Sequence, residues 1–259
     1  IIDAPMRAVP PDPPLLPVIH EDDRLIVVHK PAGLLVHRTG IDRHETRFAV
    51  QMLREQCGRF VFPVHRLDKG TSGLLVFAFD AETARSLGAA FESGAVTKRY
   101  QAVVRGWPEA TGLIDHPLAR LRDGHGDGRG EAGPAQPART AYRRLVQWEI
   151  PHRVDRYPSS RYALLELTPF TGRRHQLRRH MKHLAHPIIG DATYGQGRHN
   201  RLFQALFGCR RMLLACTALD CVHPGSGAPL HLSAPPSEDF AAVLAALGGG
   251  GERGHPVSG

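Results

Sequence analysis

The sequence has few cysteines, no long apolar run and a shortage of acidic residues. Its four cysteines, Cys57, Cys209, Cys216 and Cys221, lack the close paired spacing of a zinc site or a redox motif. We expect free thiols in a reducing compartment. No apolar run approaches the length of a membrane span, and residues 1–17 are proline-rich without the apolar core of a signal peptide. These absences predict a cytoplasmic protein with no membrane partner.

Acidic side chains are outnumbered by basic ones. The chain has 25 Asp and Glu against 33 Lys and Arg, for a formal net charge of +8. Such a balance favours a polyanionic partner such as nucleic acid, although excess charge also serves solubility. The 42% of apolar and 22% of charged residues are typical of a globular protein. We find no internal repeat or linker, and expect an extended arm over 1–17, one domain over 18–245 and a disordered glycine-rich tail over 246–259.

Hydrophobic periodicity predicts a chain that mixes strands with helices. Strands are expected at 24–29, 59–64, 74–79, 100–104 and 162–167, helices at 48–56, 82–91 and 175–185, and a further buried apolar segment at 211–219. Residues 123–137 have the composition of a polar loop. Within it, 128–133 match the Gly-x-Gly-x-x-Gly pattern of dinucleotide-binding proteins. We reject that match because no strand precedes it and Pro134 follows it.

Residues 65–73, which read His-Arg-Leu-Asp-Lys-Gly-Thr-Ser-Gly, are the most informative stretch. They put Asp68 in a glycine-bounded turn between two apolar runs, where flanking Arg66 and Lys69 favour an ionised and accessible carboxylate. On spacing alone, an aspartate that only hydrogen-bonds its own turn is the more common case.

The wider pattern resembles the nucleophile motif of the pseudouridine synthases related to the ribosomal large-subunit enzyme A, the RluA group. Three further segments resemble that family in the same order: the Lys-Pro-Ala-Gly at 30–33, the Lys-Arg-Tyr at 98–100, and residues 171–178. The resemblance runs from about Ile19 to about Ala234. It implies an α+β fold, a single catalytic domain with a mixed, largely antiparallel sheet flanked by helices and a basic RNA-binding cleft.

The resemblance also implies roles for individual residues. Asp68 matches the nucleophile, and whether it attacks carbon 6 of the base or carbon 1′ of the ribose is left open. Tyr100 matches a tyrosine that stacks on the base and is assigned proton abstraction from carbon 5. Arg178 matches an arginine that pairs with the catalytic aspartate, and Arg66 one that fills the space of the flipped nucleotide. The chemistry requires no metal and no cofactor.

Residues 171–183 are strongly basic. They carry Arg173, Arg174, Arg178, Arg179 and Lys182 and no acidic residue. On a helix, residues 174, 178 and 182 share one face. Their like charges repel one another, and a bound phosphate or carboxylate would relieve that repulsion. We expect these residues, with Lys69, to contact RNA, and a solvated basic face is the alternative. The spacing of His175, His180, His183 and His186 puts them on different faces, which argues against a metal site.

The substrate is narrowed by a further resemblance. Segments 36–38, 133–143, 156–162 and 178–191 resemble the tRNA pseudouridine synthase C subgroup, which acts on a uridine in the T-stem of certain tRNAs, position 65. The chain also begins close to the catalytic fold, so we expect no extra N-terminal RNA-binding domain, and we expect a monomer. One departure is Lys69-Gly70, where an Arg-Pro pair is expected in the subgroup.

Three alternatives stay open. The same chemistry could act on large-subunit rRNA or on another tRNA position. A non-catalytic basic RNA-binding module would use the same residues for binding alone. An aspartyl-phosphate phosphotransferase is the least favoured, because that chemistry normally has a second aspartate where this chain has Gly70.

Overall fold

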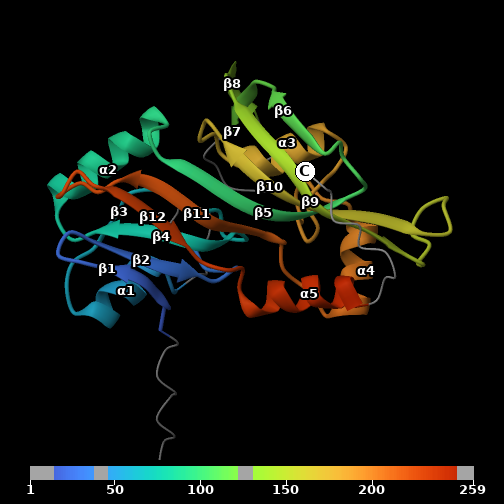
Figure 1. Cartoon of the computed structure of the whole chain (residues 1–259), viewed down its shortest axis with the longest axis horizontal. Helices are drawn as coiled ribbons and strands as arrows, with labels where there is room; N and C mark the ends of the chain where they lie inside the picture. The colour runs from blue at the N-terminus through green and yellow to red at the C-terminus, as the bar shows by residue number, and fades with distance from the viewer. Residues whose placement is uncertain (1–14, 38–45, 122–130, 250–259) are drawn as a thin grey trace, which may run out of the picture.

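A mixed sheet of ten strands runs through the computed structural model, which describes residues 15–37, 46–121 and 131–249 (Figure 1). The main path of the sheet is β1-β2-β4-β11-β5-β10-β9-β6, with β3 paired to β4 and β12 to β11. Among the described strands of this sheet, only β4 and β11 pair in parallel. Strands β7 and β8 form a separate two-stranded sheet. This confirms the predicted α+β fold with a mixed, largely antiparallel sheet.

The strands are β1 Val18–Glu21, β2 Leu25–Lys30, β3 Phe62–Pro63, β4 Ser72–Ala78, β5 Thr97–Arg105, β6 Thr111–Asp115, β7 Leu118–Leu121, β8 Glu131–Gln136, β9 Arg139–Ile150, β10 Ser160–Pro169, β11 Leu214–Val222 and β12 Pro229–Ser233. The helices are α1 Ala49–Cys57, α2 Ala81–Ser93, α3 Gln176–His183, α4 Gly197–Phe207 and α5 Glu238–Gly249. None of these described helices has the length and apolar character needed to cross a bilayer.

Two hydrophobic cores cover opposite faces of the central strands. Ala102 and Val104 of β5 belong to the first core and Val103 to the second, as expected from the alternation of side chains along a strand. Helices α1, α2 and α3 contribute to the first core, and α4 and α5 to the second. Figure 1 shows α4 and α5 side by side at one end of the molecule, away from α1 and α2.

Local sequence signals explain several element ends. Helix α2 begins after Asp80, whose carboxylate accepts a hydrogen bond from the Thr83 amide at 2.8 Å, and it ends at Gly94 in the left-handed conformation. The predicted strands at 24–29, 74–79, 100–104 and 162–167 and the predicted helices at 48–56, 82–91 and 175–185 are confirmed within a few residues at each end.

Some expectations about elements were wrong. The expected strand at 59–64 is reduced to β3, and Phe60 is 71% exposed, with the Arg54 guanidinium over its ring. Part of the expected loop at 123–137 forms β8, because residues 131–136 find hydrogen-bonding partners in β7. The last residues of the rejected dinucleotide motif are thus in a strand, and not at a helix start as that motif requires.

The expected boundary of the C-terminal tail also shifts. Helix α5 continues to Gly249, because Leu247 is buried in the second core and holds the last turn. Residues 246–249 are therefore helical. The rest of the expected tail, most of the expected arm at 1–17, and residues 122–130 lie outside the described residues.

Candidate active site

Asp68 lies in the turn between β3 and β4, and the turn is held in place by the Lys-Pro-Ala-Gly segment. The Gly33 amide donates to the Lys69 carbonyl at 2.8 Å. The Lys30 ammonium donates to the same carbonyl at 3.3 Å, and to the carbonyls of Pro31 at 2.9 Å and Leu34 at 2.7 Å. The two motifs, about forty residues apart in the chain, are thus one structural unit.

Lys30 has a structural role. Its side chain is fully buried, and burial lowers the pKa of its ammonium to about 7, against the opposing effect of the nearby Asp68 charge. Three carbonyl partners satisfy its three donors. We conclude that Lys30 ties the Asp68 turn to the end of β2.

Gly73, the last residue of the Asp68 motif, allows β4 and β11 to approach closely. Its φ is +105°, and a Cβ built on it would lie 2.1 Å from the carbonyl oxygen of Cys216. Cys216 is paired in turn with Tyr100 on β5. The glycine therefore brings the Asp68 turn against the strand that carries Tyr100.

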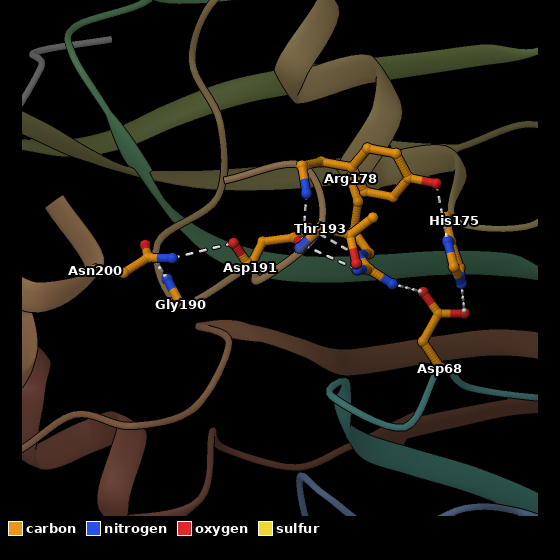
Figure 2. A network of polar contacts seen from close by, with 8 residues as sticks. Asp68, His175, Arg178, Gly190, Asp191, Thr193 and Asn200 are labelled. Carbon is orange, nitrogen blue, oxygen red and sulfur yellow. Dashed lines mark hydrogen bonds and ion pairs between the residues drawn. The ribbon is translucent and has the colours of Figure 1, made fainter. Parts of the chain in front are cut away.

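Asp68 contacts an arginine that a second carboxylate anchors (Figure 2). Arg178 Nη1 lies 3.2 Å from Asp68 Oδ2, while Arg178 Nε and Nη2 donate to Asp191 at 2.7 and 2.9 Å. Asp191 also accepts the amides of Thr193 at 2.9 Å and Tyr194 at 3.0 Å. The contact between Asp68 and Arg178 matches the expected pairing, but Asp191 is the closer partner of the arginine.

Asp191 is only 1% exposed in its side chain, against 22% for Asp68. Burial by itself would raise the pKa of Asp191, but the hydrogen bonds and charge of Arg178, together with the amides of Tyr194 and Thr193, hold the pKa below its usual range. Asn200 of α4 fixes the loop by donating to the Asp191 carbonyl at 3.0 Å and accepting the Gly190 amide at 2.8 Å (Figure 2). Asp191 is thus a buried, charged anchor for the arginine.

His175 lies on the other side of Asp68. Its Nε2 is 3.9 Å from Asp68 Oδ1 (Figure 2). Its Nδ1 is 3.1 Å from the Tyr194 hydroxyl. The residue has a left-handed conformation, φ +55°, at the start of α3. Burial lowers its pKa to about 4 although Asp68 acts in the opposite direction, so the ring is neutral near pH 7.

Asp68 and Tyr100 both line a cavity of about 720 Å³. Tyr100 is 8% exposed, and burial raises the pKa of its phenol well above the usual value, with a further contribution from the Cys216 thiol. The phenol is therefore neutral. A second cavity of about 820 Å³ adjoins the first and shares Asp68, His175 and Arg178 with it.

The structure brings some of the predicted RNA-binding residues to these cavities and not others. Arg66, Arg173 and Arg174 line the first cavity, and Lys69 lines the second. Arg179 and Lys182 lie outside both linings. The Arg179 guanidinium instead donates to the Ala119 carbonyl at 2.8 Å, and the Lys182 ammonium lies 5.9 Å from the centre of the Tyr194 ring.

Four residues of the site were given no role in it by the sequence analysis: Lys30, Lys98, His175, which was considered only as a metal ligand, and Asp191. Lys30, Lys98 and His175 lie in recognised motifs, which was the available signal, while Asp191 had none beyond its place in a segment resembling the subgroup. Among the residues that the structure describes, no group of His, Cys, Asp and Glu is arranged to hold a metal ion.

The chain was compared with protein families and with known proteins. Residues 24–183 match the family model described as RNA pseudouridylate synthase. The tRNA pseudouridine synthase C of Vibrio cholerae is 44% identical over 235 residues, covering 90% of this chain and 96% of the relative. That of Salmonella typhi is 44% identical over 236 residues, covering 90% of each.

Solved structures show the same fold. Human RNA Pseudouridylate Synthase Domain Containing 4 superposes with a TM-score of 0.67 at 26% identity, covering 89% of this chain and 92% of that one. Human RNA Pseudouridylate Synthase Domain Containing 1 superposes with a TM-score of 0.69 at 24% identity, covering 88% and 87%. A family match over more than half of the chain, together with relatives of this identity, shows that the chain belongs to the RNA pseudouridylate synthase family.

Proposed function

We propose that this protein isomerises a uridine in tRNA to pseudouridine and that Asp68 is its nucleophile. The observation that carries the proposal is the environment of Asp68. This carboxylate lines a cavity of about 720 Å³ together with Tyr100, and Arg178 contacts it from a position anchored by Asp191. The cavity is of the size of small-ligand sites in proteins, which suits one extruded nucleotide.

The reaction needs few chemical groups. The bond between N1 of the base and C1′ of the ribose breaks, the base turns, and a bond between C5 and C1′ forms. C5 loses a proton and N1 gains one, so atoms and electrons balance without a redox partner. One nucleophile and a site that excludes water are enough, and Asp68 supplies the nucleophile by either route, at carbon 6 or at carbon 1′.

Tyr100 is proposed to stack on the base. Its phenol is buried and neutral, with a raised pKa, so it is a poor proton acceptor before the base is bound. An aromatic face beside the carboxylate orients the ring of the uracil and keeps water away.

Arg66 is proposed to assist extrusion of the nucleotide. It lies on the same turn as Asp68, is exposed, and lines the cavity. A guanidinium plane that enters the vacated space recovers part of the stacking lost when a base flips. Arg173 and Arg174, which line the same cavity, would bind the flanking phosphates.

The assignment to tRNA is supported by the relatives. Those that carry the name tRNA pseudouridine synthase C include chains from 42% to 48% identical to this one. We propose the T-stem uridine at position 65 as the target. Asp68, Tyr100, Arg178 and Asp191 all come from one chain, so we propose that the protein acts as a monomer.

The test compares the wild type with Asp68→Asn on tRNA and rRNA transcripts, with pseudouridine mapped at single-nucleotide resolution after carbodiimide labelling. Asp23→Asn, a change at an exposed carboxylate outside both cavities, is the matched control. Product at the T-stem uridine with the wild type and the control, but not with Asp68→Asn, is expected.

Two other results would contradict the proposal. Product in rRNA alone would agree with the proposed mechanism but contradict the assignment of tRNA as the substrate. Full activity of Asp68→Asn would show that this residue is only a structural part of its turn, and the protein would then have no assigned nucleophile. RNA binding is measured beside activity, because a nucleophile variant should still bind.

A further inference from the structure

Lys98 is a buried cation beside Tyr100. It lies two residues before the tyrosine on β5, so both side chains are on the same face of the strand. It is 7% exposed, and it lines the same cavity as Asp68 and Tyr100. Neighbouring Arg99 is on the opposite face, where it pairs with Asp220 at 2.8 Å.

The Lys98 ammonium has no anionic partner within the described part of the chain. It forms no ion pair and no hydrogen bond with the residues that the structure describes. Burial lowers the pKa of the ammonium, and among the residues that the structure describes the Cys216 thiol opposes that shift. An ammonium buried without a counter-charge is costly, so such groups are rare in structural roles.

The neighbouring His65 does not satisfy Lys98. Its Nε2 already accepts the Val76 amide at 3.1 Å, and its ring stacks on Phe91 with centroids 4.3 Å apart. Burial and the Lys98 charge lower its pKa to about 3, so the ring is neutral and its remaining nitrogen carries the proton. The fold therefore places a cation at the cavity wall with no hydrogen-bonding or ionic partner in the described part of the chain.

We propose that Lys98 donates a hydrogen bond to a carbonyl oxygen of the target uracil and stabilises the negative charge that the base carries during the reaction. This inference rests on the proposed function. If Asp68 attacks C1′, the uracil leaves with the electron pair of the N1–C1′ bond, and its charge spreads over N1 and the carbonyl oxygens. If Asp68 attacks carbon 6, the added electron pair moves onto C5 and O4. A cation fixed at O4 stabilises either species, whereas a cation at O2 stabilises only the species formed by attack at C1′.

A backbone phosphate is the less suitable ligand for this group. Arg66 and Arg173 line the same cavity and are exposed, where they can follow the strand of the RNA. Lys98 is buried beside the tyrosine proposed to stack on the base, and a neutral carbonyl that acquires charge only in the reaction fits a water-poor position.

The test measures single-turnover rates and RNA affinity for Lys98→Met, with Arg99→Met as the matched control on the opposite face of β5. Lys98→Met should lower the rate at saturating enzyme by about a hundredfold or more, the loss typical of a removed charge-stabilising donor. Its RNA dissociation constant should be unchanged. Arg99→Met should keep both values.

Substrates with sulfur in place of one carbonyl oxygen separate this role from a structural one. Sulfur is a poor hydrogen-bond acceptor. With the wild type, the reaction should therefore be slower on whichever substrate, 2-thiouridine or 4-thiouridine, has sulfur in place of the oxygen that Lys98 contacts. The same substitution should have a smaller effect in Lys98→Met. If the variant loses its fold by circular dichroism, the comparison uses Lys98→Arg, which keeps the charge but moves it.

If the sulfur substitution slows the wild type and Lys98→Met by the same factor, the inference is wrong. It is also wrong if Lys98→Met loses RNA binding and rate together, because that result indicates contact with a phosphate. A wild type that makes no pseudouridine would instead refute the proposed function. The two failures are therefore distinguishable.

Discussion

Arg178 is held mainly by Asp191 and only secondarily by Asp68. Two of its nitrogens donate to Asp191 at 2.7 and 2.9 Å, and a third lies 3.2 Å from Asp68. The arrangement fixes the guanidinium through a carboxylate that is almost fully buried, and it leaves Asp68 with one contact to the arginine and access to the cavity. This access suits the nucleophilic role proposed for Asp68, because a nucleophile must be able to reach the reacting carbon.

Asp191→Asn should therefore lower activity without removing any group that touches substrate. The neutral amide cannot pair with two guanidinium nitrogens, so Arg178 would shift away from Asp68, and we expect a loss in rate of about a hundredfold. Breaking this buried pair should also cost roughly 3 kcal/mol of unfolding free energy. Single-turnover assays and urea unfolding measure the two effects, with Asp220→Asn, at a more exposed pair, as the control. Unchanged activity would show that Asp68 alone positions Arg178.

Gly73→Ala should destabilise the protein strongly. The residue has φ +105°, and its new methyl group would meet the Cys216 carbonyl at 2.1 Å, so β4 and β11 would have to separate. We expect a loss of at least about 3 kcal/mol in unfolding free energy from strain and lost packing. Gly88→Ala is the matched control, since that Cβ meets no atom within 4 Å and α2 should gain up to about 1 kcal/mol. Equal effects of the two changes would contradict the close approach of the strands.

Asp22 should contribute stability that depends on pH. Its pKa is about 2, below the usual 3.8, because hydrogen bonds from His20, His223 and two backbone amides outweigh the opposing effect of burial. A lowered folded-state pKa gives stability that is present above pH 3.8 and lost as the pH falls through 2. Because solvent screens this partly exposed group, Asp22→Asn should be less stable than the wild type by about 1 kcal/mol at pH 6, and the gap should narrow towards pH 2. Urea unfolding across this range measures it, and a gap that does not change with pH would contradict the assignment.

Arg173→Gln should weaken the salt dependence of RNA binding. If this exposed arginine at the cavity meets a phosphate, its loss should reduce the slope of log affinity against log salt by about 1. Arg198→Gln, at an exposed arginine outside both cavities, should leave the slope unchanged. Filter-binding titrations at several salt concentrations provide the slopes. Equal slopes for wild type and Arg173→Gln would remove this residue from the RNA interface.

The fold class and the expected central place of Asp68 followed from the resemblance to the RluA group. From hydrophobic patterns, four of the twelve described strands and three of the five described helices were predicted within a few residues at each end. These features are local or nearly so. The apolar run of a buried strand and the spacing of a helix are each encoded within about ten residues. The predicted strand at 59–64 failed because apolarity alone does not say which neighbours a segment meets, and Phe60 is left exposed beside Arg54.

Only the tertiary structure decided how the site is held. The pairing order β4-β11-β5 brings Gly73, Cys216 and Tyr100 together. The bond from Lys30 to the Lys69 carbonyl and the anchoring of Arg178 by Asp191 also depend on how distant segments pack. Whether a buried charge such as Lys98 has a counter-ion is a property of the surrounding space, which no spacing of residues along the chain encodes.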